Sequence, residues 1–419
     1  GNSIASGGNF NVVVGDEAGT AITTGDANVA VGFEALKTVS TASNNTAVGH
    51  NAGLSITSGA QNTAVGRLSL DALTEGSANV ALGNAALTAD TLGSKSTAVG
   101  NAALGAQNFT TATNTYNVAV GYNAGSQVTT GIKNVIVGGL ALDAATTGQE
   151  NTAIGHQALT ADTKGNRSVA VGQGTLVTQN FTTSTSVYNT AVGYSAGNSI
   201  TTGVENTLIG ALTGDALTDA DFNIAIGWGA LGADTLGSKS VAIGVGTLDA
   251  QNFTTATDSF NVAVGHNAGG AVTTGVENTL IGGLAGDALT DADYNVALGV
   301  YALSVDTLGS ASTAIGYGSL STQNFTTATS SYNVAVGYRA GYVLTTGVRN
   351  TFIGGLAGDA QTTSNDNVAI GYAALTTETS GARCVAVGLH ALNTQNVGSG
   401  TDASNVAVGN QAGYAVTTG

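Results

Sequence analysis

The side chains best suited to chemistry in this sequence are carboxylates that recur at a fixed interval. One set stands at equivalent places in successive repeats, at Asp71, Asp143, Asp215, Asp287 and Asp359, and a second at Asp90, Asp162, Asp234 and Asp306. Ca²⁺ takes about six to eight oxygen ligands, and stacked acidic turns could supply some of them. The candidate calcium ligands are Asp215, Asp219, Asp221, Asp287, Asp291 and Asp293. The alternative, which we favour, is a solvated acidic edge that discourages lateral aggregation.

Other catalytic signatures point away from an enzyme. Paired carboxylates suit a polysaccharide-cleaving β-helix, but such enzymes interrupt their regularity to build a cleft, and this chain does not. His50 and His266 stand at a repeat position that carries Tyr in other copies, which indicates surface residues. Cys384 stands where equivalent copies carry Ser and has no second cysteine to pair with. We predict no enzyme and no cofactor.

One modification signal recurs in the sequence. The tripeptide Asn-Phe-Thr fits the acceptor rule for N-glycosylation. It occurs at Asn108, Asn180, Asn252 and Asn324. All four copies come from one duplicated stretch, so they count as a single signal for glycosylation.

The element that must position these residues is a five-residue motif. It reads Asn, Val or Thr, usually Ala, then Val, Ile or Leu, then Gly, and it occurs 23 times from Asn11 onward. Copies such as those at Asn11, Asn28 and Asn45 define a 17-residue coil, and from Asn45 every fourth coil is a 21-residue one. Four coils form a 72-residue super-repeat, with units starting at 45, 117, 189, 261, 333 and 405. We expect a partial coil at 1–10 and one continuous repeat domain at 11–419.

A 17-residue period predicts a parallel β-solenoid of about 23 coils, with a 21-residue coil every fourth. The chain has 62 Gly and no Pro, which suits tight corners and unbroken ladders of backbone hydrogen bonds. Stacked Asn side chains can form an amide ladder; the alternative is a corner residue in the left-handed region. The ladder residues include Asn117, Asn134, Asn151, Asn189, Asn206 and Asn223.

The two faces of the predicted strand suggest an assembly. The fourth motif position is always aliphatic, and we assign it to the interior. The third position is Ala in 18 copies, and no motif position carries a charge. A strand without outward polar residues is usually covered on both faces, so we assign the third position to a homo-oligomer interface, most simply a trimer. Its residues include Ala119, Ile136, Leu208, Leu280 and Phe352.

Composition excludes several partners. The net charge is −16, which argues against nucleic acid and against an anionic membrane surface. No stretch approaches the roughly 18 apolar residues of a membrane span. Thr at the thirteenth coil position recurs in 17 of the 18 shorter coils, a pattern that raises ice binding as an alternative, although a dense two-column array is lacking.

The run Asn189-Thr190-Ala191-Val192-Gly193-Tyr194-Ser195-Ala196-Gly197, closed by Thr201-Thr202-Gly203, resembles the head repeats of YadA-like trimeric autotransporter adhesins and the 17-residue repeats of phage tail-fibre-like proteins. The resemblance covers nearly the whole chain. It implies a left-handed parallel β-roll, trimeric assembly and surface attachment, although the YadA repeat is shorter and no anchor is present.

Together these features predict an extracellular structural fibre on a cell or virion surface, forming an oligomeric stalk or head for attachment. Its partner would be itself and a host-surface glycan or protein. The alternative is a subunit of a head-to-tail polymerised filament; an ice-binding solenoid and a polysaccharide-acting enzyme are less favoured.

Overall fold

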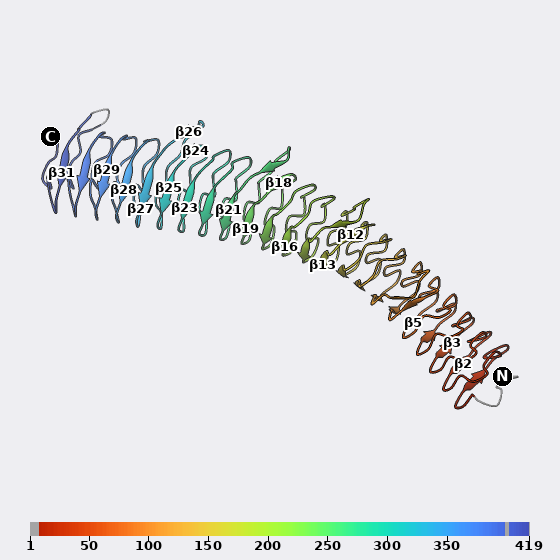
Figure 1. Cartoon of the computed structure of the whole chain (residues 1–419). Coiled ribbons are helices and arrows are strands. Elements are labelled where there is room, and N and C mark those ends of the chain that lie inside the picture. Colours follow the sequence, from red (N-terminus) through yellow and green to blue (C-terminus); the bar gives the residue numbers. More distant parts are fainter. Residues whose placement is uncertain (1–7, 399–401, 419) are drawn as a thin grey trace. The chain divides into compact units, whose positions relative to one another are not determined.

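The computed structural model describes residues 8–398 and 402–418. It is an all-β parallel solenoid of about 23 turns, with about 17 residues per turn, and the described residues form no helix. The predicted parallel β-solenoid is therefore confirmed. The chain divides into two compact units, residues 1–206 and 207–419, and each is a stack of coils (Figure 1). Most of the predicted partial coil at 1–10 lies outside the described residues.

In the first unit every coil contributes one three-residue strand to a parallel sheet. These strands are β1 (Val12–Val14), β2 (Val29–Val31), β3 (Thr46–Val48), β4 (Thr63–Val65), β5 (Val80–Leu82), β7 (Thr97–Val99), β9 (Val118–Val120), β10 (Val135–Val137), β11 (Thr152–Ile154), β13 (Val169–Val171) and β15 (Thr190–Val192).

The second unit repeats this arrangement. Its strands are β16 (Thr207–Ile209), β17 (Ile224–Ile226), β19 (Val241–Ile243), β21 (Val262–Val264), β22 (Thr279–Ile281), β23 (Val296–Leu298), β25 (Thr313–Ile315), β27 (Val334–Val336), β28 (Thr351–Ile353), β29 (Val368–Ile370), β30 (Val385–Val387) and β31 (Val406–Val408).

Neighbouring strands pair in strict register, so that each motif position lies opposite the same motif position of the next coil. Val12 pairs with Val29 across a short coil, and Thr97 pairs with Val118 across a long one. Each of four long coils also forms a short two-stranded ribbon with the coil before it. These ribbons are β6 (Gly93–Ser94) with β8 (Thr113–Asn114), β12 (Gly165–Asn166) with β14 (Thr185–Ser186), β18 (Gly237–Ser238) with β20 (Thr257–Asp258), and β24 (Gly309–Ser310) with β26 (Thr329–Ser330).

The invariant glycine of the motif is required by close backbone approach. Gly121 has a φ of +142°, and a Cβ placed on it would lie 2.5 Å from the carbonyl oxygen of Gly138 in the next coil. L-residues with side chains rarely adopt such a φ. The same geometry recurs along both units, so a side chain at this position would force successive coils apart.

The interior is narrow and is filled by three coil positions besides the strand. Ala119 of the strand, Ala124 at position 8 and Val128 at position 12 are all fully buried. Position 9 is either Leu or Gly, and both adopt a positive φ there, for example Leu375 at 56° and Gly358 at 57°. In most coils a small strand residue goes with Leu at position 9, as Ala369 does with Leu375, both fully buried. The coils directly before Ile136, Leu208, Leu280 and Phe352 instead combine Ala with Gly.

In the coils of Leu208, Leu280 and Phe352, which have a large strand residue, position 9 is glycine. Ile136 is the exception: its own coil carries Leu142, and the glycine that faces it is Gly125 of the preceding coil. Phe352 is fully buried, and Cβ atoms placed on Gly341 and Gly358 would lie 2.7 Å from its ring. Leu280 has the same relation to Gly269 and Gly286. Interior volume is thus conserved by exchange between position 3 and position 9 of the same or the preceding coil, as expected for a core packed at crystal-like density.

This exchange predicts a rescue between two substitutions. Phe352→Ala should destabilise the second unit by about 3–5 kcal/mol because it leaves a cavity, and Gly358→Leu alone should destabilise it by overpacking. The double variant recreates the Ala369/Leu375 pair and should be more stable than either single variant. Urea unfolding followed by circular dichroism measures the order; additive losses in the double variant would contradict the exchange.

Candidate functional site

The motif asparagines join each coil to itself and to the next coil. The Nδ2 of Asn117 donates to the carbonyl oxygen of Gly131 in the same coil at 2.8 Å. Its Oδ1 accepts the backbone N–H of Asn134 in the next coil at 2.9 Å. Both side chains are fully buried. Direct contact between the two amides is longer, at 3.4 Å, so the ladder runs mainly from side chain to backbone rather than from amide to amide.

The remaining predicted ladder residues make the same kinds of bond. Asn151 donates its backbone N–H to Asn134 Oδ1 at 3.0 Å, and Asn206 donates to Asn189 Oδ1 at 2.9 Å. Asn223 donates from Nδ2 to Gly237 at 2.9 Å. The corner residue in the left-handed region is the one before the Asn, for example Lys133 with a φ of 59°. These side chains are structural and offer no site to a ligand.

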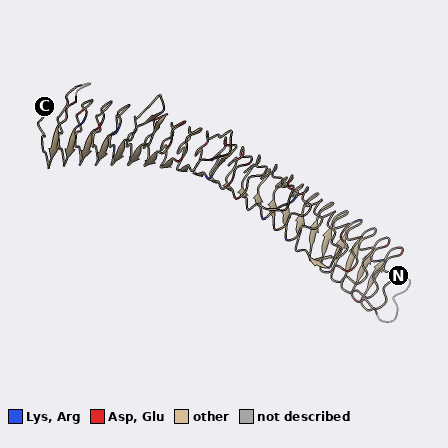
Figure 2. Cartoon of the chain, turned by 45° about the horizontal axis from the view of Figure 1, so that its top comes forward, with Lys and Arg blue, Asp and Glu red and all other residues tan. Residues whose placement is uncertain are grey.

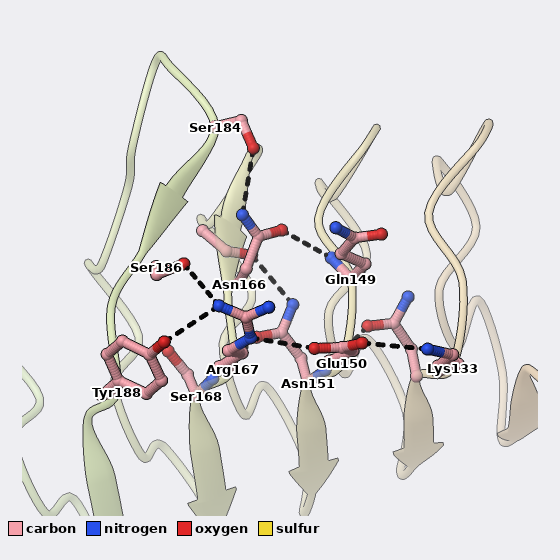
Figure 3. Close-up of polar contacts among 12 residues, drawn as sticks. Lys133, Gln149, Glu150, Asn151, Asn166, Arg167, Ser168, Ser184, Ser186 and Tyr188 are labelled. Atoms are coloured by element: carbon pink, nitrogen blue, oxygen red, sulfur yellow. Dashed lines mark hydrogen bonds and ion pairs between the residues drawn. The ribbon is translucent and has the colours of Figure 1, made fainter.

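Three successive corner residues of the first unit, Lys133, Glu150 and Arg167, carry charges that pair from coil to coil (Figure 3). Lys133 Nζ lies 3.1 Å from Glu150 Oε1, and Arg167 Nε lies 2.9 Å from Glu150 Oε2. Arg167 Nη1 also donates to the hydroxyl of Tyr188 at 2.9 Å. Hydrogen bonds from Arg167 and Lys133 lower the pKa of Glu150. Because these groups are solvated, each pair contributes little stability.

In the coil that precedes a long coil, a buried carboxylate stands where other coils carry an aliphatic residue. The Oδ2 of Asp306 accepts Gln323 Nε2 at 2.5 Å, and its Oδ1 accepts the backbone N–H groups of Gly309 at 3.1 Å and Phe325 at 2.9 Å. Asp306 is fully buried, and burial raises its pKa against the opposing effect of these hydrogen bonds. The expectation of a solvated acidic edge is wrong at this position.

The same glutamine carries the asparagine ladder across the serine that interrupts it. Gln323 Nε2 donates to Ser312 Oγ at 2.8 Å, and its Oε1 accepts Asn333 Nδ2 at 2.9 Å. Equivalent networks contain Asp90, Asp162 and Asp234. In the last long coil Gln395 bonds Glu378 and Cys384 instead. Cys384 is buried in this network in the place of the serine.

The predicted calcium ligands are not brought together. Asp215 and Asp287 occupy coil position 10, and burial raises the pKa of both. Asp291 accepts a hydrogen bond from Thr274 Oγ1 at 2.7 Å, and Asp293 accepts the backbone N–H of Val276 at 2.8 Å. Asp219 and Asp221 lie at the positions that Asp291 and Asp293 occupy in their own coil. Within residues 8–398 and 402–418, no three or more His, Cys, Asp or Glu side chains group as a metal site.

The strand faces are reversed from the sequence prediction. The predicted interface residues Ala119, Ile136, Leu208, Leu280 and Phe352 are fully buried in the interior of single coils. The second and fourth motif positions point outward instead: Val118 is 36% exposed and Val120 is 37% exposed. The reason is volume, because the narrow interior accepts Ala at most coils. The outward face, which we call the strand stripe, is uncharged along both units (Figure 2).

The threonine column and the glycosylation signal also have defined places. Thr at position 13 donates its hydroxyl to the next coil, as Thr129 does to the carbonyl oxygen of Thr146 at 3.0 Å. These hydroxyls are therefore engaged within the stack. Asn108, Asn180 and Asn252 are exposed and Asn324 is half-buried, while the following phenylalanines, for example Phe109, pack inward. Glycosylation at the four asparagines stays a prediction.

Three surface hollows lie in the second unit, each over a glycine at coil position 7. The first, of about 340 Å³, lies over Gly318 between Tyr301 and Arg339. The others lie over Gly229, beside Trp228 and Asp215, and over Gly246, beside Asp249. Sequence reasoning missed these sites. The available signal was a glycine at position 7, which at Gly318 stands between Tyr301 and Arg339.

No protein-family model matches the chain, and comparison with curated proteins found no match. Among the described residues, no helix is both long and apolar enough to pass through a membrane. The fold and its surfaces therefore carry the functional argument.

The buried carboxylates predict a particular dependence of stability on pH. Burial raises the pKa of Asp90, Asp162 and Asp306. The folded chain thus holds these protons more tightly than the unfolded chain, whose Asp pKa is about 3.9. This contribution to stability is fully present below the unfolded pKa and is lost as the pH rises through the folded value.

The urea concentration at the unfolding midpoint should therefore decrease as the pH rises from about 4 to neutrality. Asp306→Asn should make this decrease with pH less steep. The exposed Asp291→Asn is the matched control, since it removes a charge from the same unit without removing a buried carboxylate. An unchanged slope in the Asp306 variant would contradict the assignment.

Proposed function

We propose that this chain is a non-catalytic structural fibre protein that works outside the cell, in the stalk or head of a surface-attachment assembly. The observation that carries the proposal is the uninterrupted register of coils, held by buried Asn and Gln side chains. Each coil adds about 4.8 Å of length, so repeat number sets the reach of the molecule. Strand ladders that pair along the stack axis resist extension along it.

We further propose that the strand stripe is the face through which copies of the chain associate. In each unit the stripe is two side chains wide and more than ten coils long, on the order of 500 Å². A patch of that area is of the size of the largest apolar patches on monomeric proteins, about 300–600 Å², which are often functional.

The number of chains in the assembly has to be measured. The prediction of a trimer rested on an outward alanine stripe and on the family resemblance, and the first of these is removed by the burial of Ala119 and its equivalents. Flat stripes pack face to face in pairs, and three can surround an axis. A head-to-tail filament is the alternative assembly, which electron microscopy distinguishes as continuous fibres instead of discrete particles.

One observation favours a second candidate function. Threonine stands in nine of the 23 second motif positions, and these positions face outward on the flat stripe. Regular outward Thr and Val are compatible with ice binding. Thermal hysteresis of the purified protein tests this alternative, and its absence together with self-association supports the fibre.

Charge placed on the strand stripe should dissociate the assembly without unfolding the coils. We expect Leu82→Lys with Val120→Lys, both outward on strands, to give the mass of a single chain by light scattering, because buried unpaired charges at an interface cost several kcal/mol. The control is Val245→Lys with Val305→Lys, which are similarly exposed but lie off the strands. A wild-type chain that is already monomeric, or equal effects of both pairs, would refute the proposal.

A further inference from the structure

A hollow lies over Gly318 on the surface of the second unit. Tyr301, Gly318 and Arg339 occupy coil position 7 in three successive coils. Because Gly318 has no side chain, a space of about 340 Å³ opens between the other two. Coils two steps apart are separated by about 10 Å. The ring of Tyr342 takes part of that gap, since two of its carbon atoms lie 3.4 Å from where a Cβ on Gly318 would be. The hollow is the space left beside it.

The walls of the hollow are tyrosine rings that remain exposed. Tyr317 and Tyr338 stack with centroids 5.7 Å apart and planes 13° apart, and Tyr301 meets Tyr317 edge-on at 6.0 Å. Tyr317 is 49% exposed and Tyr338 is 55% exposed. Tyrosine offers an apolar ring and a hydroxyl that donates and accepts. Such walls suit a ligand with an apolar face and several hydroxyl groups at its edge.

Arg339 gives the hollow a cation that the protein itself does not pair. Its guanidinium lies 3.9 Å over the ring of Tyr342. Within the described part of the chain, its side chain forms no ion pair, whereas Arg349 and Arg383 each bind a carboxylate. Burial raises the pKa of the Asp359 carboxyl, and the positive charge of Arg339 partly offsets this effect. A guanidinium held by stacking keeps its N–H groups free for a bidentate carboxylate.

We propose that this hollow binds an acidic sugar, a pyranose unit that carries a carboxylate. The ring would occupy the gap over Gly318, with its apolar face against tyrosine and its carboxylate on Arg339. Hydroxyls of the tyrosines and of Ser321, which also lines the hollow, supply hydrogen bonds to the sugar. Nucleotides fit less well, since their phosphates call for several cations and the chain carries a net charge of −16.

The inference deepens the attachment role and rests on that proposed function for the source of the sugar. It does not depend on self-association, because the hollow lies at coil positions 6, 7 and 10 and the strand stripe at positions 2 and 4 of the motif. The hollow over Gly229 is the internal contrast. It has the single tryptophan of the chain, Trp228, but its charged lining residues are Asp215 and Asp249, which would repel a carboxylate.

The test is isothermal titration of the full chain with trisaccharides that end in galacturonic, glucuronic or sialic acid, and with their neutral counterparts. Gly318→Asn fills the hollow without strain, because Asn51 and Asn267 occupy position 7 elsewhere at the same left-handed φ. A Cβ at Gly318 would also meet its nearest neighbour, Tyr342, at an ordinary 3.4 Å. Gly229→Asn is the matched control, since both glycines have a φ of 63°.

We expect the wild type to bind at least one acidic trisaccharide at least tenfold more tightly than its neutral counterpart. Gly318→Asn should abolish this binding, and Gly229→Asn should preserve it. Arg339→Gln should lower the ratio of the affinities for the acidic and the neutral trisaccharide by about tenfold or more. No binding of any acidic trisaccharide, full binding by Gly318→Asn, or equal binding of a glutamate-rich peptide would overturn the proposal.

A further variant separates the two proposals. The stripe variant with Leu82→Lys and Val120→Lys lies in the first unit and should bind the sugar as the wild type does, even as single chains. If the wild type binds the sugar but never self-associates, the proposal that copies associate through the strand stripe is refuted and the sugar site is not. Loss of sugar binding in this folded stripe variant would contradict a hollow built within one chain.

Discussion

The constraint on which this structure depends is the close approach of successive coils at the motif glycine. At Gly121 the next coil's carbonyl oxygen lies only 2.5 Å from where a Cβ would be, so the backbone itself fixes the spacing and the register. With the register fixed, identical positions stack, and every interior side chain meets the same neighbours one coil on. A single glycine column thereby makes a short repeat, which cannot bury its own apolar residues, into a continuous core.

The buried polar ladder is acceptable in this core because its members bond one another and the backbone. Asn117 bonds its own coil at Gly131 and the next coil at Asn134. Where Ser312 interrupts the ladder, Gln323 bonds it together with Asp306 and Asn333. The long coil therefore brings its own polar bridge, and the stack continues across the insertion without an unpaired amide at that point.

The period, the strand and the glycine corners were predictable from the sequence because each repeats on a fixed count. Which face of the strand points into the interior was not predictable, since alternation alone does not tell the inward side from the outward side. The deciding signal was correlated volume: Phe352 coincides with Gly341 and Gly358, and Ala369 with Leu375. The buried role of Asp306 was equally hidden, although Gln323 follows it by one coil length. The hollow needed three coils in register, which no local pattern reveals.

The division between constant and variable positions bears on where function lies. Positions 3, 5 and 9 are held by packing and backbone geometry, so they cannot vary to suit a ligand. Position 7 holds Tyr301, Gly318 and Arg339 in successive coils at nearly the same left-handed φ. The scaffold therefore accepts almost any side chain there at no cost to the core. In a solenoid, the residues that recognise a ligand must therefore occupy such positions. A glycine between an aromatic ring and an unpaired guanidinium leaves both side chains available to a ligand.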